Sequence, residues 1–176
     1  MIRYYVTDRR QGDVVRSARR AVTEGVDMIQ VREKDLPAAS LFDLVCIIRD
    51  IAMGTKTHVL VNDRVDLALA AAVDGVHLPS NGLPADRVRP LVKVLGVSVH
   101  TLQEAVAAEN AGADFIVFGP IFDTPGKQAV GLDPLQEAVH AVKIPVLAIG
   151  GITIDRIPQV LATGAAGIAG IRLFQS

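Results

Sequence analysis

The chain has few aromatic residues and a single cysteine. Tryptophan is absent, and aromatic side chains make up only 4% of the 176 residues. So few rings argue against a stacking surface for single-stranded nucleic acid, and we expect no nucleic-acid partner. Cys46 cannot form an internal disulfide, and it lies in an amphipathic helical stretch where it is interpreted as a small core residue. A lone cysteine fits a reducing compartment, so we expect a cytoplasmic protein.

An excess of one charge and long apolar runs are also missing. The 18 Lys and Arg residues nearly balance the 19 Asp and Glu residues, which leaves a net charge of −1 and no long charged block. No overall field therefore directs the molecule to nucleic acid or membrane. No apolar run approaches the roughly 18 residues of a membrane span, and the chain opens on a strand-like run instead of a signal peptide. Local positive charge must serve any anionic ligand.

Half of the residues are hydrophobic, mostly Ala, Val, Ile and Leu. The length suits one substantial core, so residues 1–176 are predicted to form one domain. Strands are predicted at residues 2–6, 28–31, 58–61, 75–78, 94–97, 115–118, 146–149 and 167–171, and helices at 13–23, 38–53, 65–72, 85–91, 102–110, 133–142 and 154–162. This alternation indicates βα units, and eight of them close most naturally into an α/β (β/α)₈ TIM barrel, whose active site lies at the carboxyl ends of the strands.

Two further features belong to the barrel itself. Before three of the predicted strands, a small residue is followed closely by Asp27, Asp74 or Asp114. The small residue makes the turn, and we interpret these segments, with their aspartates, as stabilising the fold without a chemical role. The last predicted strand ends near Ile171 with only a short tail behind it, so the eighth helix is missing or truncated. The apolar flanks beside the first and seventh helices must then be exposed or covered by another subunit, which makes a homo-oligomer an expectation.

A glycine pair follows the predicted strand 146–149. The bare backbone N–H groups of Gly150 and Gly151 could approach a phosphate closely, at the position of the recurrent barrel phosphate site. Arg172, just past the last strand, could supply further donors to the same anion. The alternative is that the glycines only make a tight turn and Arg172 is a solvated terminal residue.

Cations cluster beyond two other predicted strands. Gln30, Arg32 and Lys34 share one side of an extended chain, so Gln30 should point into the barrel mouth with the two cations above it. On an ordinary surface such a charge run is simply solvated, but its place at a strand end, facing Lys127 across the rim, favours anion binding. The loop 120–131 carries Thr124 and Lys127, and a loop of this length is more often functional than decorative.

Oxygen ligands and titratable groups follow two more strands. Asn62 and Asp63 suit Mg²⁺ bound to a substrate phosphate, although Asp63 could equally cap the helix that begins near Val65. His100, close after Ser98, is a candidate acid or base, or else a residue that bonds the loop backbone. His77 lies within a predicted strand and is interpreted as a barrel-core histidine.

Six segments resemble the thiamine phosphate synthase and thiazole tautomerase superfamily over essentially the whole length. They are Gln-Val-Arg-Glu-Lys at 30–34, Val-Asn-Asp at 61–63, Gly-Val-His-Leu at 75–78, Gly-Val-Ser-Val-His-Thr at 96–101, Phe-Gly-Pro-Ile-Phe-Asp-Thr-Pro-Gly-Lys at 118–127 and Ala-Ile-Gly-Gly-Ile at 148–152. The resemblance implies a (β/α)₈ transferase that joins a hydroxymethylpyrimidine pyrophosphate to a thiazole phosphate and releases pyrophosphate.

The resemblance also implies a role for each matched residue. Arg32, Lys34, Lys127 and Asn62 would hold the pyrophosphate, Asp63 its Mg²⁺, Gln30 the pyrimidine, and Thr124, Gly151 and the backbone near Ile171 the thiazole phosphate. Ser98 would face the leaving group. The catalytic set of the synthase is then Arg32, Ser98 and Lys127, with His100 serving the tautomerase reaction.

The chain departs from the synthase pattern after residues 75–78. That pattern continues with a Gly-Gln-Glu-Asp-like run that supplies a second magnesium carboxylate, whereas this chain reads Leu-Pro-Ser-Asn-Gly at 78–82. The Leu-Pro-Ser sequence resembles the tautomerase branch, in which a histidine at the position of His100 transfers a proton. Gly126 stands where a hydroxyl residue usually precedes the lysine, and Arg172 where a small residue is usual.

We favour the synthase, because the larger set of matched residues serves the departure of pyrophosphate. The alternatives are a thiazole tautomerase, which isomerises a thiazole carboxylate phosphate, another barrel with a phosphorylated substrate, such as an isomerase of tryptophan or pentose metabolism, and a catalytically inactive ligand-binding homologue.

Overall fold

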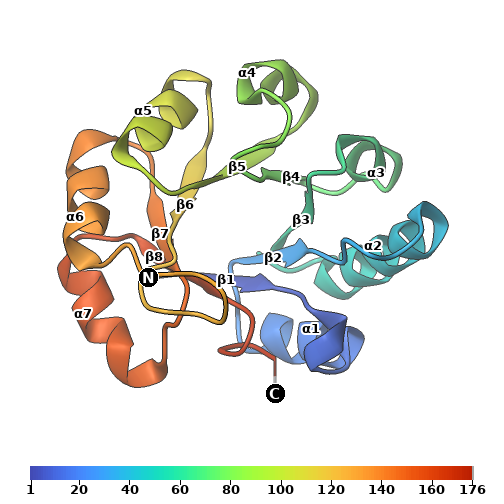
Figure 1. Cartoon of the computed structure of the whole chain (residues 1–176). Helices are drawn as coiled ribbons and strands as arrows, with labels where there is room; N and C mark the ends of the chain where they lie inside the picture. Colours follow the sequence, from blue (N-terminus) through green and yellow to red (C-terminus); the bar gives the residue numbers. More distant parts are fainter. Residues whose placement is uncertain (176) are drawn as a thin grey trace.

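The computed structural model describes residues 1–175 and forms a closed barrel of parallel strands (Figure 1). Each strand pairs with its neighbours in the sequence, and the last pairs with the first. The strands are β1 (Ile2–Val6), β2 (Met28–Val31), β3 (His58–Asn62), β4 (Gly75–Leu78), β5 (Val94–Val99), β6 (Phe115–Phe118), β7 (Val146–Ile149) and β8 (Gly167–Gly170). The predicted barrel is confirmed, and only the ends of β3, β5 and β8 differ.

Helices surround the barrel on its outside (Figure 1). The α-helices are α1 (Val14–Thr23), α2 (Ala38–Ala52), α3 (Val65–Ala70), α4 (Ala85–Val88), α5 (Leu102–Asn110), α6 (Leu132–Ala141) and α7 (Ile157–Ala162), and the 3₁₀ turns are η1 (Arg9–Gln11), η2 (Arg89–Leu91) and η3 (Ile154–Arg156). The predicted helices 85–91 and 154–162 are each split into a 3₁₀ and an α segment. Pro90 explains the first split, because it lacks the N–H that would continue α4.

Alternation along the strands separates two apolar layers. One fills the barrel interior and consists of Tyr4, Met28, Leu60, Phe115, Val117, Leu147 and Ala169. A larger one lies between strands and helices and includes Tyr5, Ile29 and Ile116. Neighbours such as Tyr4 and Tyr5 therefore face opposite sides, as successive strand residues must. Because side chains fill the interior, a ligand has to bind at the rim.

The three aspartates that precede strands stabilise the barrel, as predicted. Each carboxylate accepts a hydrogen bond from a backbone N–H near the start of the preceding strand: Asp27 from Arg3 at 2.7 Å, Asp74 from Val59 at 2.8 Å and Asp114 from Leu95 at 2.7 Å. All three bonds lie at the amino-terminal ends of the strands, away from the expected site. They connect adjacent strands and help to set the barrel register.

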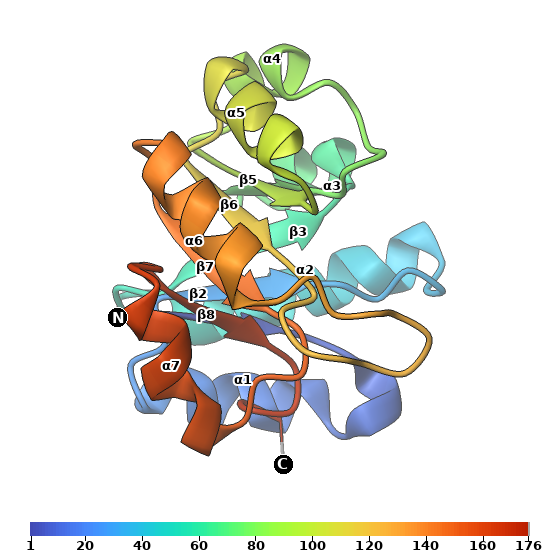
Figure 2. The same cartoon turned by 60° about the vertical axis from the view of Figure 1, so that its left-hand side comes forward.

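Within residues 1–175 no helix follows β8, as predicted, and a short turn at 172–174, followed by Gln175, takes its place. The turn lies between α7 and α1 (Figures 1 and 2). Phe174 is buried against the ring of Tyr5, with the ring centroids 6.0 Å apart. The Gln175 side chain accepts from the Tyr5 hydroxyl at 2.9 Å and donates to the Asp8 carbonyl at 2.6 Å. The turn therefore covers part of the flank that was expected to be open.

In residues 1–175 none of the helices combines the length and the apolar character that crossing a bilayer requires. Cys46 is a free, partly buried thiol that packs against the outer apolar layer, in agreement with its interpretation as a small core residue.

Candidate active site

The β6–α6 loop, which carries Thr124 and Lys127, extends past the barrel at the carboxyl ends of the strands (Figure 2). Its tip is a tight turn. Thr124 donates its N–H to the Lys127 carbonyl at 3.2 Å, and Lys127 donates back to Thr124 at 2.9 Å. Pro125 and Gly126 lie between them, and Gly126 has a φ of 77°. Proline followed by a positive-φ glycine is the signature of a type II turn. Gly126, a departure from the synthase pattern, therefore has a local conformational reason.

Three cations meet at this rim. The pKa of Lys34 is lowered, chiefly by the charge of Arg32 and also by burial and by Lys127, while Asp63 acts in the opposite direction. The backbone N–H of Arg32 is held by the Thr7 hydroxyl at 3.0 Å. In the described part of the chain, Arg32, Lys34 and Lys127 form no ion pair. Their mutual repulsion would be relieved by a bound anion.

The carboxylate between two of these cations does not neutralise them. Glu33 is buried, and its two carboxylate oxygens each accept from the Arg9 N–H at 3.1 Å. Its side chain thus points toward the segment after β1, on the opposite side from Arg32 and Lys34, as the alternation predicts. A small cavity of about 170 Å³ adjoins the cations and is lined by Asp8, Arg10, Arg32, Glu33, Lys34 and Asp35.

Asp63 follows Asn62, the last residue of β3, and its side chain is exposed. The interpretation of Asp63 as a helix cap is wrong, because the N-cap of α3 is Arg64, with no side-chain capping bond. Asp63 instead has a φ of 60°, a conformation that aspartate tolerates better than most residues. A Cβ atom built on Gly82 would lie 3.0 Å from Asp63 Oδ1. The position that lacks the second carboxylate is therefore directly beside the first.

Among residues 1–175, no cluster of three or more His, Cys, Asp and Glu side chains is arranged to hold a metal ion. Mg²⁺ commonly binds through only one or two carboxylates when substrate phosphates complete its shell. The Asp63 carboxylate and the Asn62 amide fit that kind of site, which depends on the substrate for its remaining ligands.

The glycine pair after β7 packs against the β6–α6 loop. Gly150 and Gly151 have φ values of 101° and 63°. A Cβ atom would lie 2.5 Å from Pro120 Cβ at Gly150 and 2.7 Å from Phe122 Cβ at Gly151. Any larger residue would therefore displace the loop. Within residues 1–175 the Gly151 N–H donates to no carbonyl of the chain. The pair makes a tight turn and also leaves the Gly151 N–H available as a donor. The phosphate-binding role of the pair stays a prediction.

Sequence reasoning missed Arg156. Its guanidinium donates to the Gly151 carbonyl at 2.9 Å and lies 4.4 Å from the centroid of the Phe122 ring. One side chain thus holds the glycine turn and the β6–α6 loop together. The sequence carried no signal for it, because Arg156 comes from η3 and nothing local distinguishes it from a solvated arginine.

The structure places Arg172 and Ile171 toward the segment after β1. The exposed Arg172 side chain donates its Nε–H to Gln11 Oε1 at 3.3 Å. The Ile171 carbonyl accepts from the Phe174 and Gln175 N–H groups, both at 3.0 Å. Neither contact brings the arginine to the glycine turn, and its phosphate contact stays a prediction.

His100 is exposed at the rim, and its Nδ1 donates to the Gly119 carbonyl at 2.5 Å. Backbone bonding of the imidazole is therefore confirmed. Since Nδ1 carries the proton in the neutral ring, Nε2 is the basic nitrogen. An acid or base role for His100 stays a prediction.

Gln30 points into the barrel, as predicted, and is buried there. Its Nε2 donates to the Tyr4 hydroxyl at 3.1 Å. That hydroxyl lies 3.2 Å from His77 Nδ1, and His77 Nε2 lies 2.8 Å from Ser98 Oγ. His77 is thus the core histidine with satisfied hydrogen bonds that was predicted. Tyr4 was missed, because an aromatic residue in an apolar strand gives no sign that its hydroxyl joins two polar groups.

Burial lowers the pKa of His77 to about 3, with a smaller contribution from the charge of Arg32. The unfolded chain binds the proton near pH 6.5. Above that pH neither state binds it, so His77 does not lower the free energy of unfolding there. As the pH falls toward 3, only the unfolded state gains the proton. The free energy of unfolding should then fall by up to about 1.4 kcal/mol per pH unit through His77 alone.

Urea unfolding between pH 5 and 7 of the unmodified chain and of His77→Gln should reveal this slope as the difference between the two. His58, His100 and His140 are present in both proteins, so their contributions cancel in the difference. Equal slopes would mean that His77 is accessible to protons in the folded state.

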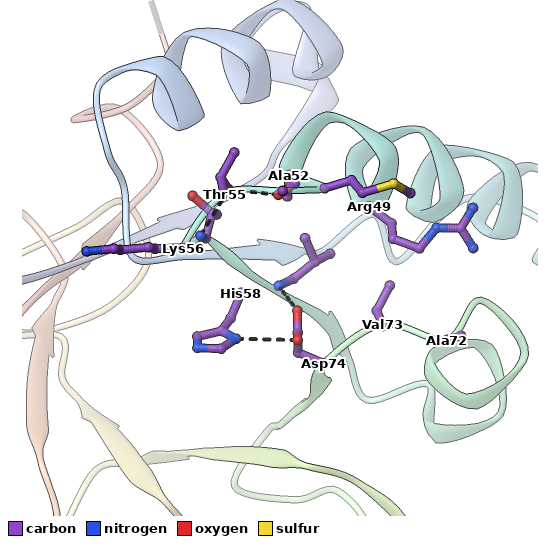
Figure 3. Close-up of a pocket in the computed structure, with 12 residues that line it drawn as sticks. Arg49, Ala52, Thr55, Lys56, His58, Ala72, Val73 and Asp74 are labelled. Atoms are coloured by element: carbon purple, nitrogen blue, oxygen red, sulfur yellow. Dashed lines mark hydrogen bonds and ion pairs between the residues drawn. The ribbon is translucent and has the colours of Figure 1, made fainter.

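A larger cavity lies at the opposite end of the barrel, where β3 begins. It has a volume of about 550 Å³. Figure 3 shows His58 joined to the Asp74 carboxylate, at 3.4 Å. Arg49, which also lines this cavity, contacts Asp50 at 2.8 Å. None of the predicted rim residues lines it, and it is not the candidate active site.

Unpaired cations and a glycine turn at the carboxyl rim of a βα barrel are typical of enzymes that act on phosphorylated small molecules. Comparison with known sequences specifies which of them. The sequence model of the thiamine monophosphate synthase family matches residues 3–174. The chain belongs to the thiamine monophosphate synthase family.

Individual relatives agree. The chain is 45% identical over 176 residues to a putative thiamine-phosphate synthase of Geobacter sulfurreducens, covering 94% of this chain and 83% of the relative. It is 40% identical to the thiamine-phosphate synthase of Roseiflexus castenholzii, covering 94% and 77%. The solved thiamine phosphate pyrophosphorylase of Pyrococcus furiosus superposes with a TM-score of 0.90 at 39% identity, covering 97% and 85%. The predicted family, fold and synthase function agree with these findings.

Proposed function

We propose that this chain joins a hydroxymethylpyrimidine pyrophosphate to a thiazole phosphate. The bond between the pyrimidine methylene carbon and the pyrophosphate oxygen breaks, and its electron pair leaves with the pyrophosphate. The thiazole ring nitrogen then forms the new bond to that carbon. The observation that carries the proposal is the cluster of Arg32, Lys34 and Lys127, which has no ion-pair partner within residues 1–175.

The cluster acts on the leaving group. Negative charge grows on the pyrophosphate as the bond breaks, and fixed positive groups stabilise that charge without reorganising during the reaction. Ser98, at the same end of the barrel, would donate a hydrogen bond to a leaving-group oxygen. The same cations also keep the product anion from recombining with the cationic pyrimidine before the thiazole nitrogen reaches it.

Asp63 and Asn62 would hold a Mg²⁺ ion at the pyrophosphate. When bound, the ion offsets negative charge on the leaving group. Since the chain supplies a single carboxylate here, we expect the metal to bind weakly in the absence of the pyrophosphate.

Gln30 would orient the pyrimidine. Its Nε2 donates to Tyr4, so its amide oxygen is left to accept from a donor on the pyrimidine ring. At the other side of the rim, we assign the thiazole phosphate to Thr124, the Gly150-Gly151 turn, the backbone near Ile171 and Arg172. The Gly151 N–H that meets no carbonyl within residues 1–175 supports this assignment.

A thiazole tautomerase is the second candidate. It is favoured by the exposed ring of His100, whose Nδ1 donates to Gly119 and leaves Nε2 as a base. The absence of a carboxylate at Gly82 also favours it, since proton transfer by a histidine needs no metal.

One assay separates the candidates. The chain is incubated with both precursors and Mg²⁺, and with a thiazole carboxylate phosphate in a parallel reaction. We expect thiamine phosphate and pyrophosphate in equal amounts, no thiamine phosphate when either precursor is omitted, and no isomerisation. Isomerisation without thiamine phosphate would assign the chain to the tautomerase branch. No turnover, together with thermal stabilisation by the precursors, would mark an inactive ligand-binding homologue.

We also propose a cytoplasmic location, because the only cysteine, Cys46, is a free thiol in a partly buried position. A homo-oligomer stays a proposal. The flank between α7 and α1 is the surface where a second copy would bind, and light scattering of the purified chain measures its mass.

A further inference from the structure

A continuous path of hydrogen bonds crosses the barrel interior and ends at the rim. It joins side chains of four strands in the order Gln30, Tyr4, His77 and Ser98, with contacts of 3.1, 3.2 and 2.8 Å. Gln30, Tyr4 and His77 are buried, and Ser98 is half-buried. The proposed function places the two ends of the path, Gln30 and Ser98, against the substrate, whereas Tyr4 and His77 contact none.

The direction of the path follows from its first donor. The Tyr4 hydroxyl accepts from Gln30 Nε2. Burial raises the pKa of Tyr4 above its ordinary value, so the hydroxyl keeps its proton. That proton must point to the other neighbour, His77 Nδ1, which therefore accepts. A neutral imidazole with an accepting Nδ1 carries its proton on Nε2.

The consequence falls on Ser98. With its proton on Nε2, His77 donates to Ser98 Oγ over the contact of 2.8 Å. The Ser98 hydroxyl therefore cannot donate its proton to the imidazole and can donate it to another group. If the path ran the other way, the serine proton would point to His77, and the serine oxygen would present lone pairs to an anionic leaving group. Only the direction inferred from the Gln30–Tyr4 bond lets the serine stabilise negative charge.

We propose that His77 is a positioning residue, which Tyr4 holds in the Nε2–H tautomer so that the Ser98 hydroxyl serves as a donor to the leaving group. This role rests on the proposed function, in which Ser98 faces the pyrophosphate. The reaction then depends on Tyr4 and His77, two buried residues that contact no substrate.

The surroundings confine the imidazole to this orientation. Its ring centroid lies 5.6 Å from that of Tyr4 and 5.9 Å from that of Phe115. A Cβ atom built on Gly96 would lie 2.7 Å from His77 Nδ1 and 2.4 Å from Phe115 Cζ. Glycine at position 96 is therefore required for the ring to lie where it reaches both Tyr4 and Ser98.

The first test needs no substrate. In protein labelled with ¹⁵N at histidine, NMR distinguishes protonated from unprotonated ring nitrogens, and the signals that His77→Gln removes are those of His77. We expect a protonated Nε2 and an unprotonated Nδ1 from pH 6 to pH 8, and a mixture of tautomers in Tyr4→Phe. A protonated Nδ1 in the unmodified chain would overturn the proposal.

The second test measures turnover. A glutamine at position 77 can place an N–H donor near the site of Nε2, whereas an asparagine is too short. We expect His77→Asn and Ser98→Ala each to lower kcat about a hundredfold with little change in KM, and His77→Gln to keep most of the activity. Combining His77→Asn with Ser98→Ala should cost nothing beyond Ser98→Ala alone.

Equal losses in the asparagine and glutamine variants, or losses that add to that of Ser98→Ala, would show a merely structural histidine. The two tests also separate this proposal from the proposed function. A chain that makes no thiamine phosphate would refute the function, while the tautomer seen by NMR would still decide whether His77 donates to Ser98.

Discussion

Lys127→Ala is expected to lower the turnover of thiamine phosphate at least about a hundredfold, the scale on which one well-placed electrostatic donor contributes to catalysis. Lys127 is held at the tip of the β6–α6 loop by the turn with Thr124, and its charge acts on Lys34 across the rim. Its side chain is exposed, so truncation leaves no cavity and should change the free energy of unfolding by less than about 0.5 kcal/mol.

Steady-state kinetics and urea unfolding of the same preparation measure both quantities. Lys56→Ala is the matched control, because it removes the same charge from the opposite end of the barrel, beside the cavity shown in Figure 3. It should leave turnover unchanged. Near-normal turnover in Lys127→Ala would return Lys127 to the solvated surface and weaken the case for the cation cluster.

Metal removal is expected to abolish the synthase reaction. A chelator and Asp63→Asn should each eliminate measurable thiamine phosphate, because the three side-chain cations do not replace the divalent charge that a metal brings to the leaving pyrophosphate. His100→Ala should retain most of the activity, since pyrophosphate departure requires no proton transfer by that histidine. Metal-independent thiazole isomerisation that is lost in His100→Ala would instead assign the chain to the tautomerase branch.

Gly82→Asp extends this experiment. A Cβ atom at position 82 would lie 3.0 Å from Asp63 Oδ1 and 2.9 Å from Pro79 Cδ, so the proline has to shift slightly. The added carboxylate would then stand beside Asp63 and share the ion with it. Titration of activity with Mg²⁺ should show half-maximal activity at a lower concentration. Gly82→Asn is the control without the charge, and equal titrations of the two variants would contradict a metal site here.

Much of the site could be predicted from the sequence because the fold itself places it. Once the apolar runs are recognised as parallel strands of a barrel, every residue just past their carboxyl ends must lie on one rim. Arg32, Lys34, Asp63 and Lys127 were located in this way, and the structure brings their charges within range of one another. The strand ends at Asn62, Val99 and Gly170 were less predictable, because ladder pairing with neighbouring strands sets them.

By itself, the sequence determined the barrel, its order of strands and the charges on its rim, because these follow from local periodicity and from chain order. Tertiary structure alone decided which side chains meet across the barrel. Tyr4 joins Gln30 to His77, and Arg156 holds the glycine turn to Phe122. Such contacts depend on the strand register and on which side chains point inward. Residues that are far apart in the chain carry no local sequence pattern from which these contacts could be predicted.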